Sequence, residues 1–260
     1  MYRRGVHQGR DGPGRPVRHI QGGNAISGKR GQEGGRISFA SVPFERPPWY
    51  GPLLTPVVLA SNALLALWIY PCWRTVRITW IPSLDGLVRL VRDTGRPIIF
   101  YSWHAYEPLM LCVLRDAPAE LQPTGIGHDG LVSRMLQDAT AWFGYRVWVY
   151  RRRSPVQPKQ QIIDMVNERG CNIGLFADAG GPYGRVKPGL AEIARATQSW
   201  VIPVVVRGRP VLQVRWPRRY GFPLPFCRLV ACHGVPIDGR EATVEICQAA
   251  LEETEARATC

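Results

Sequence analysis

From residue 75 onward, short apolar segments alternate with segments of helical periodicity, and this alternation is the strongest constraint on the fold. Strands are expected at residues 76–81, 97–101, 146–150, 172–177, 201–206, 211–214 and 228–234. Helices are expected at residues 84–94, 107–115, 132–143, 157–168, 190–197 and 240–258, with a loop at 123–130. Strands that alternate with helices of about ten residues form a mainly parallel central sheet flanked by helices. The sequence therefore predicts an α/β domain over residues 75–260.

Residues 1–48 differ from this domain in composition. They are rich in Gly and Arg and contain nine Lys and Arg residues against three acidic ones. Such a segment buries too little apolar surface to offset the entropy of ordering it, so it is predicted to be a disordered basic tail. A basic arm for membrane or nucleic acid, an inert tail, and sequence translated upstream of the true start all remain open for it.

Residues 49–74 form an apolar segment with aromatic residues at both ends. The central stretch, LLTPVVLASNALLALWIY at 53–70, is about as long as a marginal membrane span but is interrupted by Pro56 and Asn62. Aromatic residues at the ends of an apolar segment are typical of a membrane interface. We expect an N-terminal membrane-associating helix that lies in the interface. A single spanning anchor and an ordinary core helix are the alternatives.

The overall charge and the cysteines limit the class of protein. The formal net charge of +13 over 260 residues suggests a polyanionic partner, either an anionic membrane surface or nucleic acid. The seven cysteines contain no CxxC pair and no spacing that indicates a metal site. Scattered cysteines in apolar contexts are typical of buried free thiols in a reducing compartment.

A histidine, His104, follows the expected strand at residues 97–101, directly after Ser102 and Trp103. In open α/β sheets, ligands bind in the crevice outside the carboxyl ends of the strands. An imidazole at that edge can exchange a proton near neutral pH, because its unperturbed pKa is about 6.5. A histidine beside a tryptophan is more often structural, so its function depends on the stretches that follow.

Two of those stretches carry charged side chains. In GHDGLVSRML, His128 and Asp129 lie between glycines, where Asp129 could also cap a helix. In YRRRSP, Arg151, Arg152 and Arg153 directly follow an expected strand. Guanidinium groups bind phosphate well, whereas three arginines in a turn could also be merely solvated.

A third stretch, LFADAGGPYGRVKPG, joins an apolar strand to a glycine-rich loop. The strand ends at Asp178, and Arg185 and Lys187 follow the glycines. Glycine-rich loops let backbone N–H groups approach an anion closely. This loop has neither the Walker spacing nor a dinucleotide-binding GxGxxG, and the sequence contains no GxSxG serine elbow that would indicate a hydrolase.

The order of these blocks resembles the glycerolipid (lysophospholipid) acyltransferase superfamily and is most similar to a bacterial branch long labelled a domain of unknown function. The blocks are WHAYEP (103–108), HDGLVSRML (128–136), YRRRSP (150–155), DAGGPYGRVKPG (178–189) and WPRRYGFPLPFCRLVACHGVPI (216–237). The resemblance covers residues 75–237 and implies acyl transfer from a thioester to a hydroxyl group.

The resemblance also implies a general base. In the superfamily the first motif is His-x-x-x-x-Asp, in which the histidine deprotonates the acceptor hydroxyl and the aspartate orients the imidazole. Here His104 is followed five residues later by Leu109. Glu107, which would share a helix face with His104, and Asp129 are therefore the two candidates for the orienting acid.

The remaining site residues implied by the resemblance bind substrate, through a basic block for the acceptor phosphate and a glycine loop with its acid and cations. They are Arg151, Arg152, Arg153, Ser154, Asp178, Gly180, Gly181, Arg185 and Lys187. No metal and no cofactor are expected, because acyl-CoA or acyl-carrier protein is the donor substrate.

The resulting prediction is a membrane-associated acyltransferase of phospholipid biosynthesis that uses a lysophospholipid-like or glycolipid acceptor. Its partners would be membrane lipids and the acyl donor, at the cytoplasmic face of the inner membrane, as a peripheral or singly anchored protein. A catalytically silent homologue that binds anionic lipid is the alternative that Leu109 favours. A nucleic-acid-binding protein driven by charge is the third and least favoured hypothesis.

Overall fold

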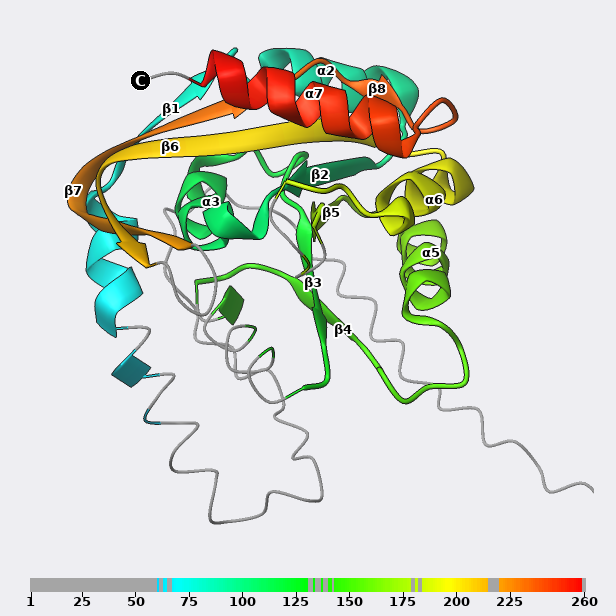
Figure 1. Cartoon of the computed structure of the whole chain (residues 1–260), viewed down its shortest axis with the longest axis horizontal. Coiled ribbons are helices and arrows are strands. Elements are labelled where there is room, and N and C mark those ends of the chain that lie inside the picture. The colour runs from blue at the N-terminus through cyan, green and yellow to red at the C-terminus, as the bar shows by residue number, and fades with distance from the viewer. Residues whose placement is uncertain are drawn as a thin grey trace, which may run out of the picture. The chain divides into compact units, whose positions relative to one another are not determined.

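An eight-stranded sheet lies at the centre of the fold, in the strand order β1-β7-β6-β2-β5-β3-β4, with β8 paired to β6 (Figure 1). The computed structural model describes residues 60, 63–64, 67–130, 133, 137, 140–141, 143–178, 181, 184–214 and 220–258. The strands are β1 Arg77–Ile81, β2 Ile98–Ser102, β3 Thr124–His128, β4 Val147–Tyr150, β5 Ile173–Phe176, β6 Trp200–Val214, β7 Tyr220–His233 and β8 Ile237–Asp238. The expected tail at 1–48 and much of the apolar segment at 49–74 lie outside the described residues.

Most strand pairs are parallel, as the sequence predicts. β2 lies between β5 and β6, β3 lies between β4 and β5, and β1 pairs with β7, all in parallel. The pairs of β6 with β7 and with β8 are antiparallel. The carboxyl ends of β2, β5, β3 and β4 therefore meet at one edge, where the candidate site residues follow their strands.

Helices cover both faces of this sheet, as expected for the predicted α/β class. They are α2 Asp85–Thr94, α3 Glu107–Val113, α5 Pro158–Arg169, α6 Pro188–Thr197 and α7 Val244–Arg257, with short 3₁₀ turns η1 His104–Tyr106 and η2 Leu114–Asp116. α7 and α3 lie on opposite sides of β6 (Figure 1). Local sequence sets the ends of the helices: Pro158 and Pro188 stand in first turns, and Gly95 and Gly170 end α2 and α5 in the left-handed conformation.

Some expected elements differ from the structure. The expected loop at 123–130 contains β3, whose TGIGH sequence lacks an apolar run. The two strands expected at 201–206 and 211–214 are one strand, β6, which passes Pro210 at a register shift, and Pro is tolerated at such irregularities. β7 begins at Tyr220, well before the expected residue 228, and β8 was not predicted. The helix expected at 132–143 lies partly outside the described residues.

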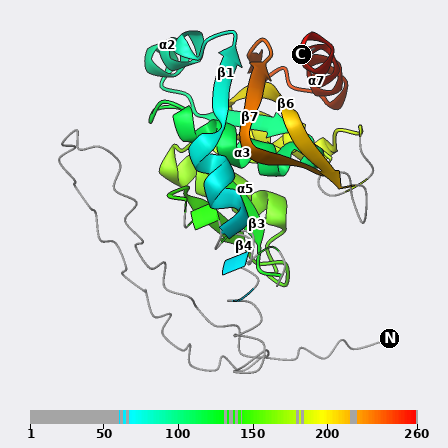
Figure 2. The same ribbon diagram turned by 90° about the vertical axis from the view of Figure 1, so that its left-hand side faces the viewer.

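The chain is helical over residues 67–75, at the end of the expected membrane-associating segment. Figure 2 shows this helix directly below β1, with β1, β7 and β6 facing the viewer. Cys72 contacts the carbonyl oxygen of Pro223 in β7 at 3.2 Å, so the helix packs against that strand. Within the part of the chain that the structure describes, no helix has the length and apolar character needed to cross a bilayer.

A buried hydrogen bond fastens α7 to β2, the strand that leads to His104. The Tyr101 hydroxyl donates to the carbonyl oxygen of Cys247 at 2.9 Å, and Tyr101 is fully buried. We expect Tyr101→Phe to lower the free energy of unfolding by about 1 kcal/mol, because it removes a buried hydrogen bond. Urea denaturation would measure this loss. Tyr70→Phe, at a tyrosine 45% exposed, is the matched control and should change the free energy little; equal effects would contradict the assignment.

Candidate active site

His104 and Asp178 meet because their strands are neighbours in the sheet. β2 and β5 are parallel and in register, with Ser102 opposite Phe176. His104 and Asp178 each follow that pair by two residues, so the chain delivers them to the same level beyond the carboxyl ends. The Asp178 carboxylate contacts His104 Nδ1 and also accepts the His104 backbone N–H at 3.4 Å. The pair thus forms from residues 74 positions apart in the chain.

The environment of the pair defines the tautomer of the imidazole. The Asp178 side chain is only 5% exposed, whereas that of His104 is 21% exposed. A carboxylate can only accept, so its contact places the neutral-state proton on Nδ1 and the lone pair on Nε2. The Phe176 ring packs against the imidazole at 4.6 Å between centroids. The arrangement is that of an oriented histidine base with one basic nitrogen directed away from its carboxylate.

The orienting acid differs from the two that the sequence suggested. The carboxylate in contact with His104 Nδ1 is that of Asp178, where Glu107 or Asp129 was expected. Glu107 begins α3 and lines the neighbouring cavity, while Asp129 accepts the backbone N–H of Arg152 at 3.3 Å. Leu109, at the position where the resemblance implies an acid, is buried in the core near Gly221 of β7. A carboxylate at that position would therefore face apolar side chains.

The three consecutive arginines lie in the loop that follows β4, at the same edge of the sheet as His104. Arg151, Arg152 and Arg153 are all exposed, and Ser154 accepts the backbone N–H of Val156 at 3.1 Å. Arg152 is held through its backbone by Asp129, next to His128. The loop therefore presents three guanidinium groups to solvent beside the carboxyl end of β3.

His128, at the end of β3, is fixed as a hydrogen-bond acceptor. Its Nδ1 accepts the backbone N–H of Gly130 at 2.9 Å. Burial, and secondly the charge of Arg152, lower the pKa of His128 below its ordinary value, against an opposing effect of Asp129. This histidine is accordingly neutral at pH 7, and its hydrogen bond to Gly130 stabilises the loop that follows β3.

The glycine-rich loop brings Lys187 back towards Asp178. Lys187 donates its backbone N–H to the Ala177 carbonyl at 2.8 Å. A Cβ placed on Gly181 would lie 2.9 Å from Lys187 Nζ and 3.0 Å from the Asp178 carbonyl oxygen, so the lysine side chain crosses the loop at this glycine. Arg185 is exposed, and Gly180 lies outside the described residues.

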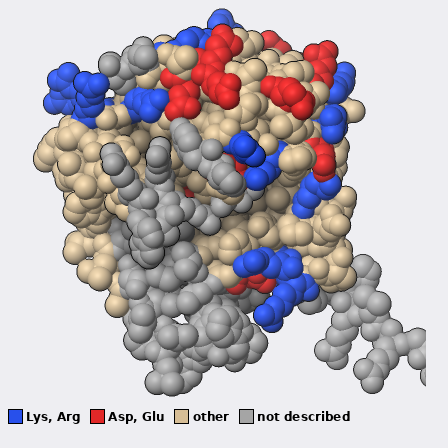
Figure 3. All heavy atoms as spheres, in the orientation of Figure 1, with Lys and Arg blue, Asp and Glu red and all other residues tan. Residues whose placement is uncertain are grey.

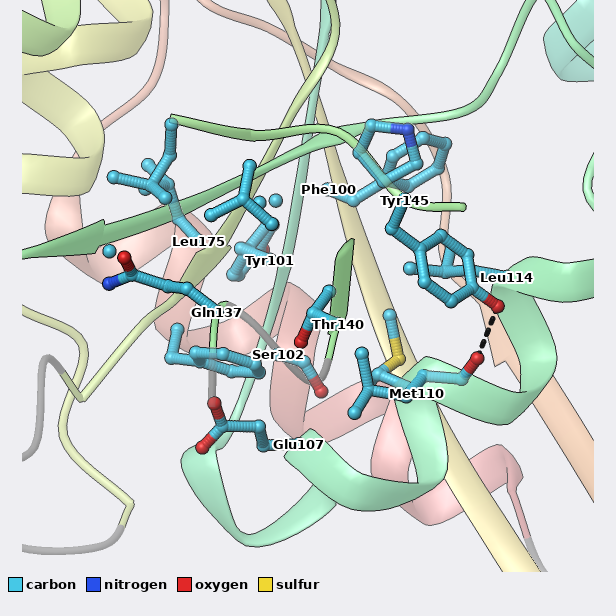
Figure 4. Close-up of a pocket in the computed structure, with 18 of the residues that line it drawn as sticks. Phe100, Tyr101, Ser102, Glu107, Met110, Leu114, Gln137, Thr140, Tyr145 and Leu175 are labelled. Carbon is cyan, nitrogen blue, oxygen red and sulfur yellow. Dashed lines mark hydrogen bonds between the residues drawn. The ribbon is translucent and has the colours of Figure 1, made fainter. Parts of the chain in front are cut away.

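A largely apolar cavity of about 130 Å³ lies beside the histidine pair, on the α3 face of the sheet (Figure 4). A water takes up about 30 Å³ in the liquid, so the cavity has room for about four waters or for part of a hydrocarbon chain. Its lining includes Phe100, Ser102, Glu107, Met110, Leu111, Leu114, Gly125, Gly127, Tyr145, Gly174, Leu175 and Phe176. Phe176 belongs both to this lining and to the contact with His104, so its ring adjoins the cavity and the candidate base.

Glycines on two neighbouring strands leave the floor of the cavity open. Gly125 and Gly174 lie opposite each other in β3 and β5, and Gly174 is also opposite Phe100. A Cβ on Gly174 would meet only Pro123, at an ordinary 3.8 Å. Larger side chains at these two positions would fit the backbone and occupy the cavity instead.

A buried hydroxyl without a partner lies at the end of the cavity next to His104. Ser102 is 1% exposed and lines the cavity, and its Oγ has no hydrogen-bond partner among the described residues. An unsatisfied buried hydroxyl is destabilising, so its position favours a polar atom of a ligand as its partner. Neither Ser102, which follows an expected strand, nor Phe176, which lies in one, was predicted to be a site residue. The signal that could have found the histidine pair is that His104 and Asp178 each follow the end of an expected strand within three residues.

No protein-family model and no curated protein matches this chain. Among solved structures, the chain is similar to the 1-acyl-sn-glycerophosphate (LPA) acyltransferase PlsC from Thermotoga maritima, at 14% sequence identity and a TM-score of 0.47. The match covers 79% of this chain and 83% of that chain. Within the described residues, no group of three His, Cys, Asp or Glu side chains could hold a metal ion.

The unpartnered hydroxyl predicts an unusual effect on stability. We expect Ser102→Ala to leave the free energy of unfolding unchanged or to raise it by about 1 kcal/mol, because it removes an unsatisfied buried group. Ser199→Ala is the matched control: Ser199 is equally buried, but its hydroxyl pairs with Thr197 at 2.7 Å. The control should lose about 1 kcal/mol in urea denaturation. Equal losses in both variants would show that Ser102 has a partner in the folded protein.

Proposed function

We propose that this protein is an acyltransferase that moves an acyl chain from acyl-CoA or acyl-carrier protein to a hydroxyl of a lysophospholipid-like or glycolipid acceptor. The observation that carries the proposal is the His104–Asp178 pair beside an apolar cavity. The pair offers a base for a hydroxyl, and the cavity offers a place for a chain. The order of blocks that resembles the glycerolipid acyltransferases points to the same reaction.

The proposed reaction needs no covalent enzyme intermediate. His104 Nε2 takes the proton of the acceptor hydroxyl as its oxygen attacks the thioester carbonyl carbon. Asp178 holds the imidazole through Nδ1 and stabilises the imidazolium that forms. As the carbon–sulfur bond breaks, the imidazolium returns the proton to the leaving thiolate. The products are an ester and a free thiol, and the enzyme regains its starting protonation state.

The cavity is the proposed site of the donor's acyl chain. Its lining is mostly apolar, and burial of each methylene group favours binding by about 0.8 kcal/mol. A chain in the cavity would place its thioester end near Ser102 and Phe176, the lining residues closest in sequence to the histidine pair. An oxygen atom of the ligand would then lie close to the Ser102 hydroxyl, which has no partner among the described residues.

The arginine loop is the proposed site of the acceptor's anionic group. Arg151, Arg152 and Arg153 follow β4 at the same edge of the sheet as His104, and guanidinium groups bind phosphate through paired hydrogen bonds. Lys187 and Arg185 add positive charge at the glycine-rich loop. A phosphorylated acceptor would neutralise this charge while its hydroxyl approaches His104.

Membrane association, at the cytoplasmic face of the inner membrane, is part of the proposal. The described part of the apolar segment supports it, because Leu67, Trp68 and Tyr70 are 72%, 46% and 45% exposed on their helix. The alternative of a silent lipid-binding homologue rested on Leu109. Asp178 now supplies the acid that Leu109 lacks, so the active enzyme is the better interpretation of the site.

The first test is loss of the base. We expect His104→Ala to lower kcat on the order of 10²- to 10⁴-fold, and Asp178→Asn to cause a loss within the same range, because the amide cannot stabilise the imidazolium. Purified protein would be given a long-chain acyl-CoA and a lysophospholipid in mixed micelles, with acylated lipid and released thiol measured separately. Asp164→Asn, on the exposed face of α5, is the control. Full activity in His104→Ala would refute the mechanism, and thiol release without acylated lipid would indicate hydrolysis.

The second test concerns the cavity. Gly174→Val should shift the preference among acyl-CoA donors towards shorter chains, because the added side chain takes up cavity volume at a position where a Cβ makes only an ordinary 3.8 Å contact with Pro123. The ratio of kcat/KM for long and short donors measures the shift, which we expect to be on the order of tenfold for the loss of room for one or two methylenes. Gly189→Ala, where a Cβ meets nothing within 4 Å, is the control. An unchanged ratio would exclude this cavity as the chain site.

A further inference from the structure

Three arginines stand side by side across β1, β7 and β6. Arg77 of β1 pairs in register with Arg228 of β7, and Arg228 pairs with Arg209 of β6. Residues directly opposite in a sheet project from the same face, with Cα atoms about 4.5 to 5.5 Å apart. All three are exposed. We call this set, Arg77, Arg209 and Arg228, the arginine row.

Among the described residues, the arginine row has no acidic partner. None of its members forms a salt bridge within the part of the chain that the structure describes. Like charges directly opposite each other destabilise a sheet. The row therefore costs stability in the isolated protein, and an external anion would remove that cost.

The row lies just beyond the part of the sheet that α7 covers. Two residues before Arg209 in β6, Arg207 forms a salt bridge of 3.0 Å with Glu255, in the last turns of α7. Trp103 and Tyr106 also donate to the Glu255 carboxylate, at 3.1 and 2.6 Å. The Glu255 carboxylate thus contacts residues around the carboxyl end of β2, whereas the arginine row is exposed to solvent. Lys and Arg side chains gather at the upper left of the face in Figure 3, the side on which β1, β6 and β7 lie in Figure 1.

An exposed aromatic ring adjoins the row. Phe226, two residues before Arg228 in β7, is 76% exposed and has a φ of 63°. A bulky residue in the left-handed region is strained, and such strain concentrates at functional positions. The Phe226 backbone N–H donates to Thr75 Oγ1 at 2.9 Å, which holds the Phe226 backbone beside the end of the helix at residues 67–75. That helix carries the exposed side chains of Leu67, Trp68 and Tyr70.

We propose that the arginine row and Phe226 form a docking surface for an anionic lipid bilayer. Basic side chains near an anionic leaflet attract its headgroups, and exposed aromatic and aliphatic side chains enter the interface. Nucleic acid would satisfy the charges but not the exposed Phe226 and helix side chains, so the bilayer is the better fit. The surface is independent of the acyl-transfer chemistry. It would hold the carboxyl-end edge of the sheet, where His104 lies, near the membrane.

The test is vesicle binding by the full chain. Wild type should co-sediment more strongly with vesicles of phosphatidylcholine and phosphatidylglycerol than with phosphatidylcholine alone, and salt should weaken this binding. The variant with Arg77→Gln, Arg209→Gln and Arg228→Gln should bind the anionic vesicles about 100-fold less tightly, at about fivefold per arginine. The matched control, with the same change in net charge, is Arg89→Gln, Arg146→Gln and Arg169→Gln, at exposed arginines elsewhere.

Phe226→Asn tests the apolar half of the surface. Asparagine tolerates the left-handed backbone, so the variant removes the ring without adding strain. It should weaken binding to neutral and anionic vesicles alike by a similar factor. Circular dichroism and thermal unfolding would establish that each variant is folded.

Equal vesicle binding by the arginine-row variant and its control would overturn the proposal. So would a loss confined to binding of a single-stranded oligonucleotide, which would assign the row to nucleic acid. Acyl transfer to a micellar acceptor separates this proposal from the preceding one. The arginine-row variant should keep that activity, whereas failure of the proposed function would leave wild type inactive while vesicle binding persists.

Discussion

The parallel pairing of β2 with β5 is the constraint on which the candidate site depends. It sets Ser102 opposite Phe176, and from there two residues of each chain suffice to bring His104 to the Asp178 carboxylate. Asp178 is buried, so its charge needs this partner. β2 is held in turn at both ends: Tyr101 is bonded to α7, and Arg96, just before the strand, makes paired hydrogen bonds to Asp238 at 2.8 and 2.7 Å. The Arg96 guanidinium lowers the pKa of the Asp238 carboxyl, which keeps this clamp charged.

The predicted fold follows the structure wherever a strand is apolar and bounded by turn residues. β2 and β5 are of this kind, and so is the buried first half of β6. β3 was missed because two of its five residues are glycines: Gly125 leaves the cavity floor open, and Gly127 makes room for the Gln137 side chain. The start of β7 was missed because Pro223 and Pro225 read as breakers. This part of β7 pairs with β6, and proline is tolerated there because of how the strand sits in the sheet. A local sequence pattern does not show that position.

Most individual residues of the candidate site were predicted from the sequence, but the contact between His104 and Asp178 was not. His104, Asp178 and the arginine loop were all located at carboxyl ends of strands, because apolar runs end visibly at those residues. The partner of His104 was sought close by in the sequence, at Glu107 and Asp129, since helical spacing and loop order are what a chain shows directly. Strand order is not visible in the sequence, and it is strand order that makes Asp178 the neighbour. The cavity could not be predicted either, since it depends on which faces of β2, β3 and β5 turn towards α3.

β6 is the element that the catalytic edge and the arginine row have in common. Its first half pairs with β2 and its second half with β7, within one strand of 15 residues. From Pro203, which pairs with Tyr101, to Arg209 is about 20 Å of extended chain. A single strand therefore sets a fixed spacing between the base and the charged row. With the row resting on a surface, His104 would work at a constant height above it, and only acceptors whose hydroxyl reaches that height could be acylated.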